Sequence, residues 1–586
     1  MKFRSIKHWG DSAGLESLAF FAQLMEELLF EFSLDTYKPS ALNASLLCDE
    51  ILSLINDIEN GLIKKQNLKH VVDEFVENLK KDEVAKGLIS LDLGIIYKKL
   101  NENHSDTTEV KDIINVIVNQ ISLSRYKKAC EKKLVNLMRQ PLDCGEIRTV
   151  ARNYVTTLLN SGFSSEFIYL QAKSFFYDRD KPISSNDDIG SFIAIFNNEP
   201  TKYEVLFRAD KIFNEIQDSC KKLGIEILKD APFNVENERA MEIKNSSDVY
   251  LHVKDIEARD HFKAKKYARF SVDILRTTLN LFHHKEDPSY LDFCLIREFE
   301  TEKVHRVGSN TNQMHKCNDL KPSLASKKLQ DFLSNFSLDK SSFSQFIRSS
   351  ELHAQALKTD SEENQIINLW IAIESLIPPK SSDADTIDHI INSVMPFLNL
   401  SYVHRVFRNF AKDLLNWNSA LVSDLFNGIE ANSLPEKVIL LLTQDNYQDK
   451  RNLLEANFRD FHLIKDRYFH LQGMVENPNT LYKILQSHKK RLDWQIRRIY
   501  RTRNMIVHSG KKPDNLGILI TNTHDYLDII LSGIIELAKN EAGAYSIREC
   551  FKYSSIKYDK YLSDLGKKNA KFERENISQM TCPKLI

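Results

Sequence analysis

The sequence predicts a mainly α-helical protein with a small α+β module in its middle. Only 17 glycines and 14 prolines occur in 586 residues, well below average usage of about 7% and 5%. Apolar residues recur at helical spacing along most of the chain, and 42% hydrophobic with 27% charged residues is the composition of a folded globular protein. At roughly 100–200 residues per domain, this length predicts several domains.

Residues 1–207 are expected to form a helical N-terminal region. Leu18, Phe21, Leu24 and Leu28 are spaced as on one face of a helix, and similar patterns continue to about Phe207.

Residues 208–321 are expected to form the α+β module. The segments IEIL, DVYLHVKDI and YLDFCLI alternate apolar and polar residues with a period near two, which predicts strands. Between the last two, residues 258–283 predict one amphipathic helix whose apolar stripe contains Phe262, Tyr267, Phe270, Ile274 and Leu281.

The helical period returns in residues 322–541, which predict a helical bundle, and residues 542–586 form a basic, aromatic C-terminal tail without a clear stripe. Within the bundle, residues 366–377 (IINLWIAIESLI) are apolar on nearly every side, so this helix should be buried. Glu374 lies inside it and is expected to need a cationic partner, because an unpaired buried charge is costly.

The predicted partner of Glu374 is Arg503, which lies on the apolar stripe of a helix over residues 492–508 with Ile499 and Ile506. Arginine binds carboxylates bidentately even when desolvated, so the sequence predicts a buried Arg503–Glu374 pair. A purely structural ion pair is the alternative interpretation.

Polar residues follow the arginine. Asn504 and His508 are one helical turn apart, and Ser509-Gly510 predicts the end of the helix, which places His508 in the last turn. An imidazole at that end of the helix dipole suits a general acid or base.

Positive charge is concentrated around this helix although the whole chain has a net charge of only −1. Arg497, Arg498, Arg501 and Lys511 are therefore predicted to contact RNA phosphates, with Trp494 and Tyr500 interleaved for base stacking. A solvated helix face is the alternative for such a charge run.

Other function classes lack their signatures. There is no phosphate-binding G-x-x-x-x-G-K-[ST] motif, no G-x-G-x-x-G motif and no C-x-x-C pair. We therefore expect no metal and no cofactor. No secretory leader and no run of about 18 apolar residues is present, which predicts a cytoplasmic protein with no membrane partner.

The segment Arg503-Asn504-Met505-Ile506-Val507-His508 resembles the R-x(4–6)-H signature of HEPN ribonucleases, including a polar residue directly after the arginine. The upstream LWIAIESL looks like the tryptophan- and glutamate-bearing helix of the ApeA-like branch of this family. The resemblance covers residues 344–537, and Arg348 with His353 forms a rival R-x4-H pair on the same bundle.

The resemblance implies a metal-independent endoribonuclease in which the RNA 2′-OH attacks the adjacent phosphate, leaving a 2′,3′-cyclic phosphate and a 5′-OH. His508 would move protons, Arg503 would stabilise the phosphorane charge, Asn504 would orient or bind, and Glu374 would hold Arg503. It also implies a homodimer or higher oligomer acting on tRNA or other cellular or phage RNA. The protein would be an antiviral, abortive-infection or toxin-type effector whose remaining region senses an unknown trigger.

Two alternatives remain open from the sequence. The bundle could be a catalytically silent dimerisation or nucleotide-binding scaffold, or a helical adaptor with an accidental resemblance. The position of His508 and Asn504, in a basic groove or under neighbouring side chains, discriminates between the nuclease and the scaffold.

Overall fold

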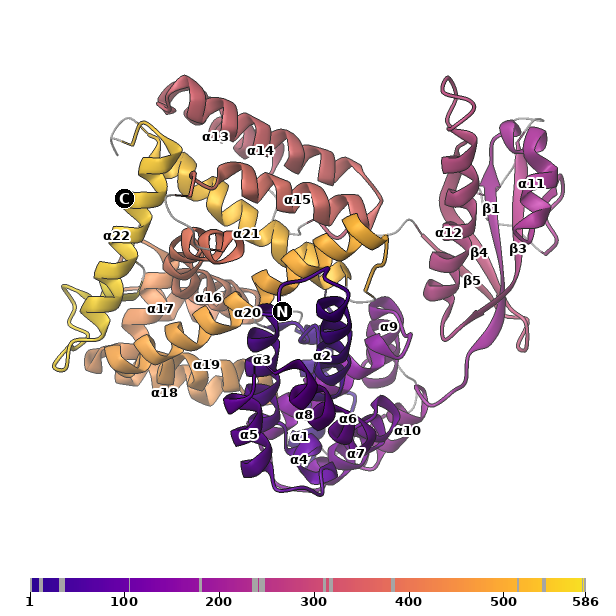
Figure 1. The fold of residues 1–586 in the computed structure, drawn as a ribbon. Coiled ribbons are helices and arrows are strands. Elements are labelled where there is room, and N and C mark those ends of the chain that lie inside the picture. The colour runs from indigo at the N-terminus through magenta and orange to yellow at the C-terminus, as the bar shows by residue number, and fades with distance from the viewer. Residues whose placement is uncertain are drawn as a thin grey trace.

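The computed structural model is mainly helical, as the sequence predicts, with one five-stranded antiparallel sheet in the middle of the chain (Figure 1). The described residues are 3–9, 14–30, 37–104, 106–178, 182–233, 241, 248–308, 312–315, 320–380, 385–513, 516–539, 544–581 and 583. Among them, no helix combines the length and the apolar character needed to cross a membrane.

The N-terminal region is helical and has its own apolar core. Its helices are α1 (Glu16–Leu29), α2 (Ala44–Glu59), α3 (Asn67–Lys81), α4 (Glu83–Leu88), α5 (Leu93–Glu102), α6 (Thr107–Gln120), α7 (Leu123–Met138), α8 (Cys144–Asn160), α9 (Ser165–Phe176) and α10 (Asp188–Ala194). Side chains of Asn43, Asp82, Asp92, Asp106 and Asp143 accept backbone N–H bonds at the starts of five of these helices.

The middle module follows the order β-α-β-β-α-β with a fifth strand added at the edge. Its elements are β1 (Thr201–Ala209), the 3-10 helix η2 (Lys211–Ile216), α11 (Gln217–Lys222), β2 (Ile225–Leu228), β3 (Val249–Ala258), α12 (His261–Leu279), β4 (Tyr290–Glu298) and β5 (Val304–Val307). The strand order β2-β3-β1-β4-β5 is a ferredoxin-like arrangement with one extra strand. The three predicted strands are confirmed, whereas the helical period predicted to Phe207 is wrong from Thr201 onward, where β1 begins.

Helix α12 corrects a second expectation. It packs on the sheet with Ala264, Ala268 and Val272, which are small or β-branched and fully buried. Of the predicted stripe, only Phe262 packs against this core, while Tyr267, Phe270, Ile274 and Leu281 are exposed. Most of the larger apolar side chains therefore lie on the outer face of α12, whereas Leu275 is buried with the small ones against the sheet.

The C-terminal region contains the predicted bundle. Its helices are α13 (Pro322–Asn335), α14 (Lys340–Lys358), α15 (Glu362–Leu376), α16 (Thr386–Phe426), α17 (Leu434–Thr443), the 3-10 helix η3 (Asp445–Tyr447), α18 (Gln448–Asn457), α19 (His462–Met474), α20 (Pro478–Ser509), α21 (Leu516–Leu537), α22 (Ile547–Leu565) and α23 (Ile577–Thr581).

This region has two apolar cores joined by α16 and α20. One contains α14, α15, α21, the first part of α16 and the second part of α20; the other contains α17–α19, the second part of α16 and the first part of α20. Residues 547–565, expected to be a tail, form α22 and bury Cys550, Phe551, Tyr558 and Tyr561 against both cores. The many basic residues of this segment obscured the helical spacing of its apolar residues in the sequence.

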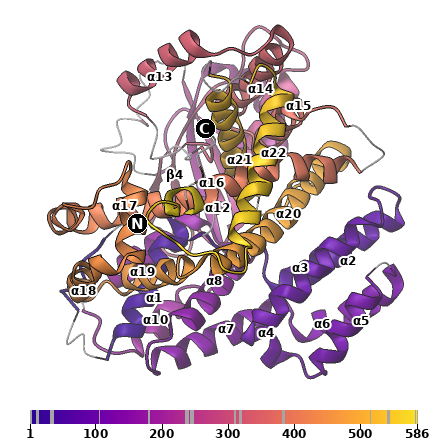
Figure 2. The same cartoon turned by 90° about the vertical axis from the view of Figure 1, so that its left-hand side faces the viewer.

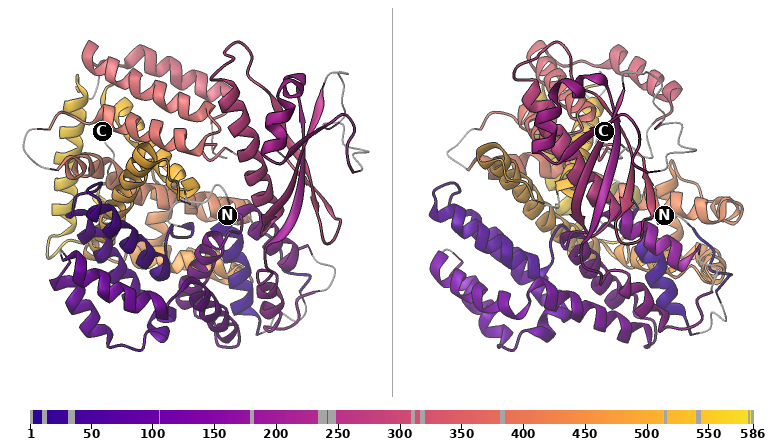
Figure 3. Two further views of the ribbon diagram at one scale, coloured as in Figure 1. Left: turned by 45° about the vertical axis from the view of Figure 1, so that its right-hand side comes forward. Right: turned by 90° about the vertical axis from the view of Figure 1, so that its right-hand side faces the viewer.

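The N-terminal region lies against the C-terminal region on the side of α19 and α20 (Figure 2). Gln23 donates to the backbone oxygen of Asp460 (2.7 Å) and accepts from the N–H of Leu463 (2.9 Å). The sheet module approaches the bundle through α12, where Lys266 pairs with Glu362 (2.8 Å) (Figure 3).

Candidate functional site

Helix α20 carries the predicted site at its C-terminal end. Its N-cap is Asn477, whose side chain accepts from Thr480, and Pro478 occupies the first turn, where no N–H is needed. It ends at Gly510, which has φ of 66° and donates its N–H to Ile506 (2.9 Å). The left-handed conformation suits glycine and closes the helix. His508 lies in the last turn, as predicted, and its side chain is exposed.

Arg503 and Asn504 lie one turn earlier. The apolar stripe is confirmed, because Leu492, Ile496 and Ile499 are buried in the bundle core. Arg503 is half-buried, and its Nη1 donates to Asn504 Oδ1 (2.9 Å). Its Nε is buried and has no hydrogen-bond partner among the described residues. Asn504 thus orients the guanidinium, which has no other hydrogen-bond partner among the described residues.

The predicted Glu374–Arg503 pair is wrong. Among the described residues, no hydrogen bond or ion pair joins these two side chains, and Glu374 is only half-buried in the last turn of α15. The contact between α15 and α20 is instead aromatic, with the ring centroids of Trp370 and Tyr500 5.6 Å apart. Tyr500 is therefore packed against the core and is not a free platform for base stacking.

Arg498 and Arg501, predicted to contact RNA, are buried at the interface with α2 and α3. Arg498 donates to Glu50 (3.1 and 2.8 Å) and to Glu74 (2.6 Å), and Arg501 donates to Glu50 (2.9 Å). We call these four residues the interface network. Its acidic members belong to the N-terminal region, so the positive charge that is unbalanced in the local sequence is balanced in the fold.

The pKa values of the two carboxyl groups in the interface network move in opposite directions. Burial alone would raise the pKa of Glu50, but the charges and hydrogen bonds of Arg498 and Arg501 outweigh burial and lower that pKa to about 2. The pKa of Glu74 is raised, because its burial and the neighbouring Glu50 charge outweigh the attraction of Arg498. Glu50, which accepts from both arginines, is therefore the carboxylate whose charged form the network stabilises.

Arg497 is also neutralised. It is buried and donates to Asp493 (3.2 Å) on its own helix and to Asp388 (2.5 Å) at the start of α16. Trp494 is buried as well, which removes the second predicted stacking platform. Of the four cations predicted to contact RNA, only Lys511 is exposed to solvent.

Arg503 consequently differs from its three neighbours. Arg497, Arg498 and Arg501 all bind carboxylates, whereas the described residues offer Arg503 only the neutral amide of Asn504. A guanidinium without a carboxylate retains its capacity to bind a phosphate.

The rival pair Arg348 and His353 does not form a comparable arrangement. Arg348 pairs with Glu351 (3.7 Å) on the exposed face of α14. His353 instead contacts His524, with 2.9 Å between the two Nε2 atoms. Neither His524 nor Asp528, which completes this group, was singled out from the sequence. Their one signal is local, a histidine and an aspartate one turn apart on a largely apolar helix that also carries Asp525 and Glu536.

The end of α20 combines an exposed imidazole, a guanidinium with free donors and a free lysine, which is a set of groups able to bind an anion and transfer protons. The described cysteines are all free thiols. Comparison of the chain with protein-family models, with curated proteins and with solved structures finds no match to any of them.

Proposed function

We propose that this chain is a HEPN-type endoribonuclease that acts in the cytoplasm on tRNA or other cellular or phage RNA. The observation that carries the proposal is the state of Arg503 at the helix end that also carries the exposed His508. Unlike Arg497, Arg498 and Arg501, Arg503 has no carboxylate partner among the described residues.

The proposed reaction uses the substrate's own nucleophile. The RNA 2′-OH attacks the adjacent phosphorus, the bond from phosphorus to the 5′ oxygen breaks, and the products are a 2′,3′-cyclic phosphate and a 5′-OH. His508 moves the protons, and Arg503, oriented by Asn504, stabilises the charge on the phosphorane oxygens. Lys511 binds a neighbouring phosphate.

The interface network supports a regulatory role for the N-terminal region. Glu50 and Glu74 hold α2 and α3 against the helix that carries the site, about two to three turns before His508. A trigger that alters the N-terminal region would thereby act on α20. This is the arrangement expected of an antiviral or toxin-type effector whose nuclease is restrained until it is needed.

Pairing of two chains, which the HEPN resemblance implies, requires apolar surface to bury. Helix α13 has no buried residue in the single chain, and Leu324, Leu329 and Leu333 are exposed on it. The adjacent start of α14 exposes Phe343 and Ile347. These side chains support a homodimer formed through α13 and α14.

The test compares His508→Ala with a control, His284→Ala, at another exposed histidine. Total RNA or tRNA is incubated with each full-length variant in EDTA, and the product ends are analysed. Loss of cleavage in His508→Ala alone, with an unchanged circular dichroism spectrum, is the expected result. Cleavage that survives His508→Ala, or that EDTA abolishes, would refute the proposal.

A catalytically silent scaffold is the second candidate, and it is favoured by the burial of Arg497, Arg498 and Arg501 in ion pairs. In that case Arg503→Ala and His508→Ala would leave RNA unaffected at every protein concentration, as the unsubstituted chain would.

A further inference from the structure

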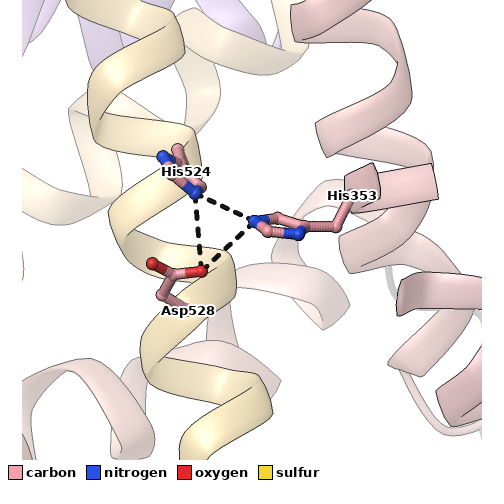
Figure 4. Close-up of side chains that lie close together, drawn as sticks. All are labelled: His353, His524 and Asp528. Carbon is pink, nitrogen blue, oxygen red and sulfur yellow. Dashed lines mark hydrogen bonds and ion pairs between the residues drawn. The ribbon is translucent and has the colours of Figure 1, made fainter. Parts of the chain in front are cut away.

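Three potential ligand atoms converge between α14 and α21 (Figure 4). His353 reaches across from α14, and His524 and Asp528 lie one turn apart on α21. The two imidazole Nε2 atoms are 2.9 Å apart, and each is 3.5 Å from Oδ1 of Asp528. We call these residues the His-His-Asp cluster.

The core on either side fixes the two helix backbones that carry the three side chains. Leu352, which precedes His353, is buried in the bundle core. On α21, Thr523 and Leu527 precede His524 and Asp528 respectively, and both are fully buried. Helices held by packing present their ligands in a fixed geometry, as a metal site requires.

The two Nε2 atoms are within hydrogen-bond distance of each other at 2.9 Å, but the position of Asp528 argues against a relay from carboxylate to imidazole to imidazole. In a relay, the carboxylate would accept from one imidazole at about 2.7–3.2 Å. Here Oδ1 of Asp528 is equally far from both imidazoles, and 3.5 Å is too long for a strong hydrogen bond to either. The three atoms therefore form a compact triangle with two equal edges.

The same distances fit one metal ion. With metal–ligand bonds of about 2.0–2.1 Å, two ligand atoms of a tetrahedral zinc ion lie roughly 3.3 Å apart. The observed edges of 2.9, 3.5 and 3.5 Å bracket that value. Two imidazoles and one carboxylate are also ligands that Zn²⁺ accepts, whereas Mg²⁺ and Ca²⁺ prefer oxygen alone.

Burial falls across the cluster, which leaves one side open. The side chain of His524 is 5% exposed, that of His353 22% and that of Asp528 38%. A site with three protein ligands and an open side has room for water as the fourth ligand, in the manner of catalytic zinc sites.

We propose that His353, His524 and Asp528 bind a divalent transition-metal ion, Zn²⁺ by preference, with one coordination position open to water. The ion joins α14 to α21 and stabilises the bundle. The His-His-Asp cluster shares no residue with the end of α20, so this site does not depend on the proposed ribonuclease activity.

The experiment uses the full-length chain, freed of metal with a chelator and then dialysed. Zn²⁺ is titrated by calorimetry, and Co²⁺ is added separately because its visible absorption reports coordination geometry. We expect one ion per chain, an intense tetrahedral Co²⁺ spectrum and a higher melting temperature with Zn²⁺ than with Mg²⁺. Absence of stoichiometric Zn²⁺ binding would overturn the proposal.

Variants locate the ion. His353→Gln and Asp528→Asn keep the shape of two partly exposed ligands, and each should weaken Zn²⁺ binding by more than the roughly 10–100-fold that loss of an outer-shell partner costs. Glu351→Gln on α14 and His389→Gln on α16 are controls outside the cluster and should bind Zn²⁺ normally. Equal Zn²⁺ affinity in all four variants would show that the ion binds elsewhere.

RNA cleavage separates this proposal from the ribonuclease proposal. If His353→Gln loses Zn²⁺ but cleaves RNA in EDTA as the unsubstituted chain does, both proposals hold. If Zn²⁺ binds as expected but no RNA is cleaved, only the ribonuclease proposal fails. If cleavage survives without stoichiometric Zn²⁺ binding, only the metal site fails.

Discussion

Replacing Arg498 by methionine should destabilise the folded chain by about 3–5 kcal/mol, the usual cost of leaving buried charges without their partner. Arg498 donates three hydrogen bonds to Glu50 and Glu74, and only Arg501 would remain to offset two carboxylates. The lowered pKa of Glu50, about 2 against 4.5 ordinarily, corresponds by itself to about 3 kcal/mol. The raised pKa of Glu74 offsets part of that contribution.

The assay is urea unfolding of full-length chains at pH 7 and at lower pH, followed by circular dichroism. Arg491→Met is the matched control, because Arg491 is an exposed arginine on the same helix. The folded-state pKa of Glu50 lies below its unfolded value, so its stabilisation is complete above about pH 5 and declines as the pH falls toward 2. The destabilisation caused by Arg498→Met should therefore be smaller at low pH than at pH 7.

If Arg498→Met lowers the free energy of unfolding by less than about 1 kcal/mol at pH 7, or by no more than Arg491→Met does, this reasoning is refuted. Either result would mean that water reaches Glu50 and Glu74 and that the interface network is an ordinary surface ion pair.

Three further results are expected. Glu374→Gln should change the melting temperature by less than about 2 °C in a thermal scan, because no described cation pairs with Glu374. A larger fall would indicate that Glu374 has a buried cationic partner. Lys511→Ala should weaken RNA binding and reduce its salt dependence by about one phosphate contact in a filter-binding titration. Arg501→Ala should chiefly lower the stability of the fold. Weaker RNA binding by Arg501→Ala with unchanged stability would show that Arg501 contacts RNA. Mixed His508→Ala and Arg503→Ala chains should recover part of the RNA cleavage that neither has alone, and no recovery at any ratio would contradict a site shared between two chains.

Local pattern was enough to predict much of the fold. The alternation in β3, the apolar run of α15 and the helix end at Ser509-Gly510 are all determined by neighbours within a few residues. The start of β1 was missed although the polar segment Asn197-Asn198-Glu199-Pro200 ends the helical period just before it. Helix α22 was missed because its lysines and tyrosines interrupt the apolar pattern of its buried positions.

The partners of individual side chains were harder to predict from the sequence, because they are residues far away in the chain. The acidic partners of Arg498 lie more than 400 residues earlier, so no local count of charges could balance them. His353 and His524 are 171 residues apart, so no local metal-ligand motif contains both. Burial of Glu374 was inferred from an apolar segment, but the last turn of α15 is partly open.

The interface network can form only late in the synthesis of the protein, because its acidic members are made long before its basic members. Its acidic and basic members are 424 to 451 residues apart in the chain, and ribosomes add about 5–20 residues per second, so the arginines emerge about 20–90 s after the glutamates. During that interval Glu50 and Glu74 face water or a chaperone. The N-terminal region can fold on its own core early, yet its attachment to α20 is among the last steps of synthesis.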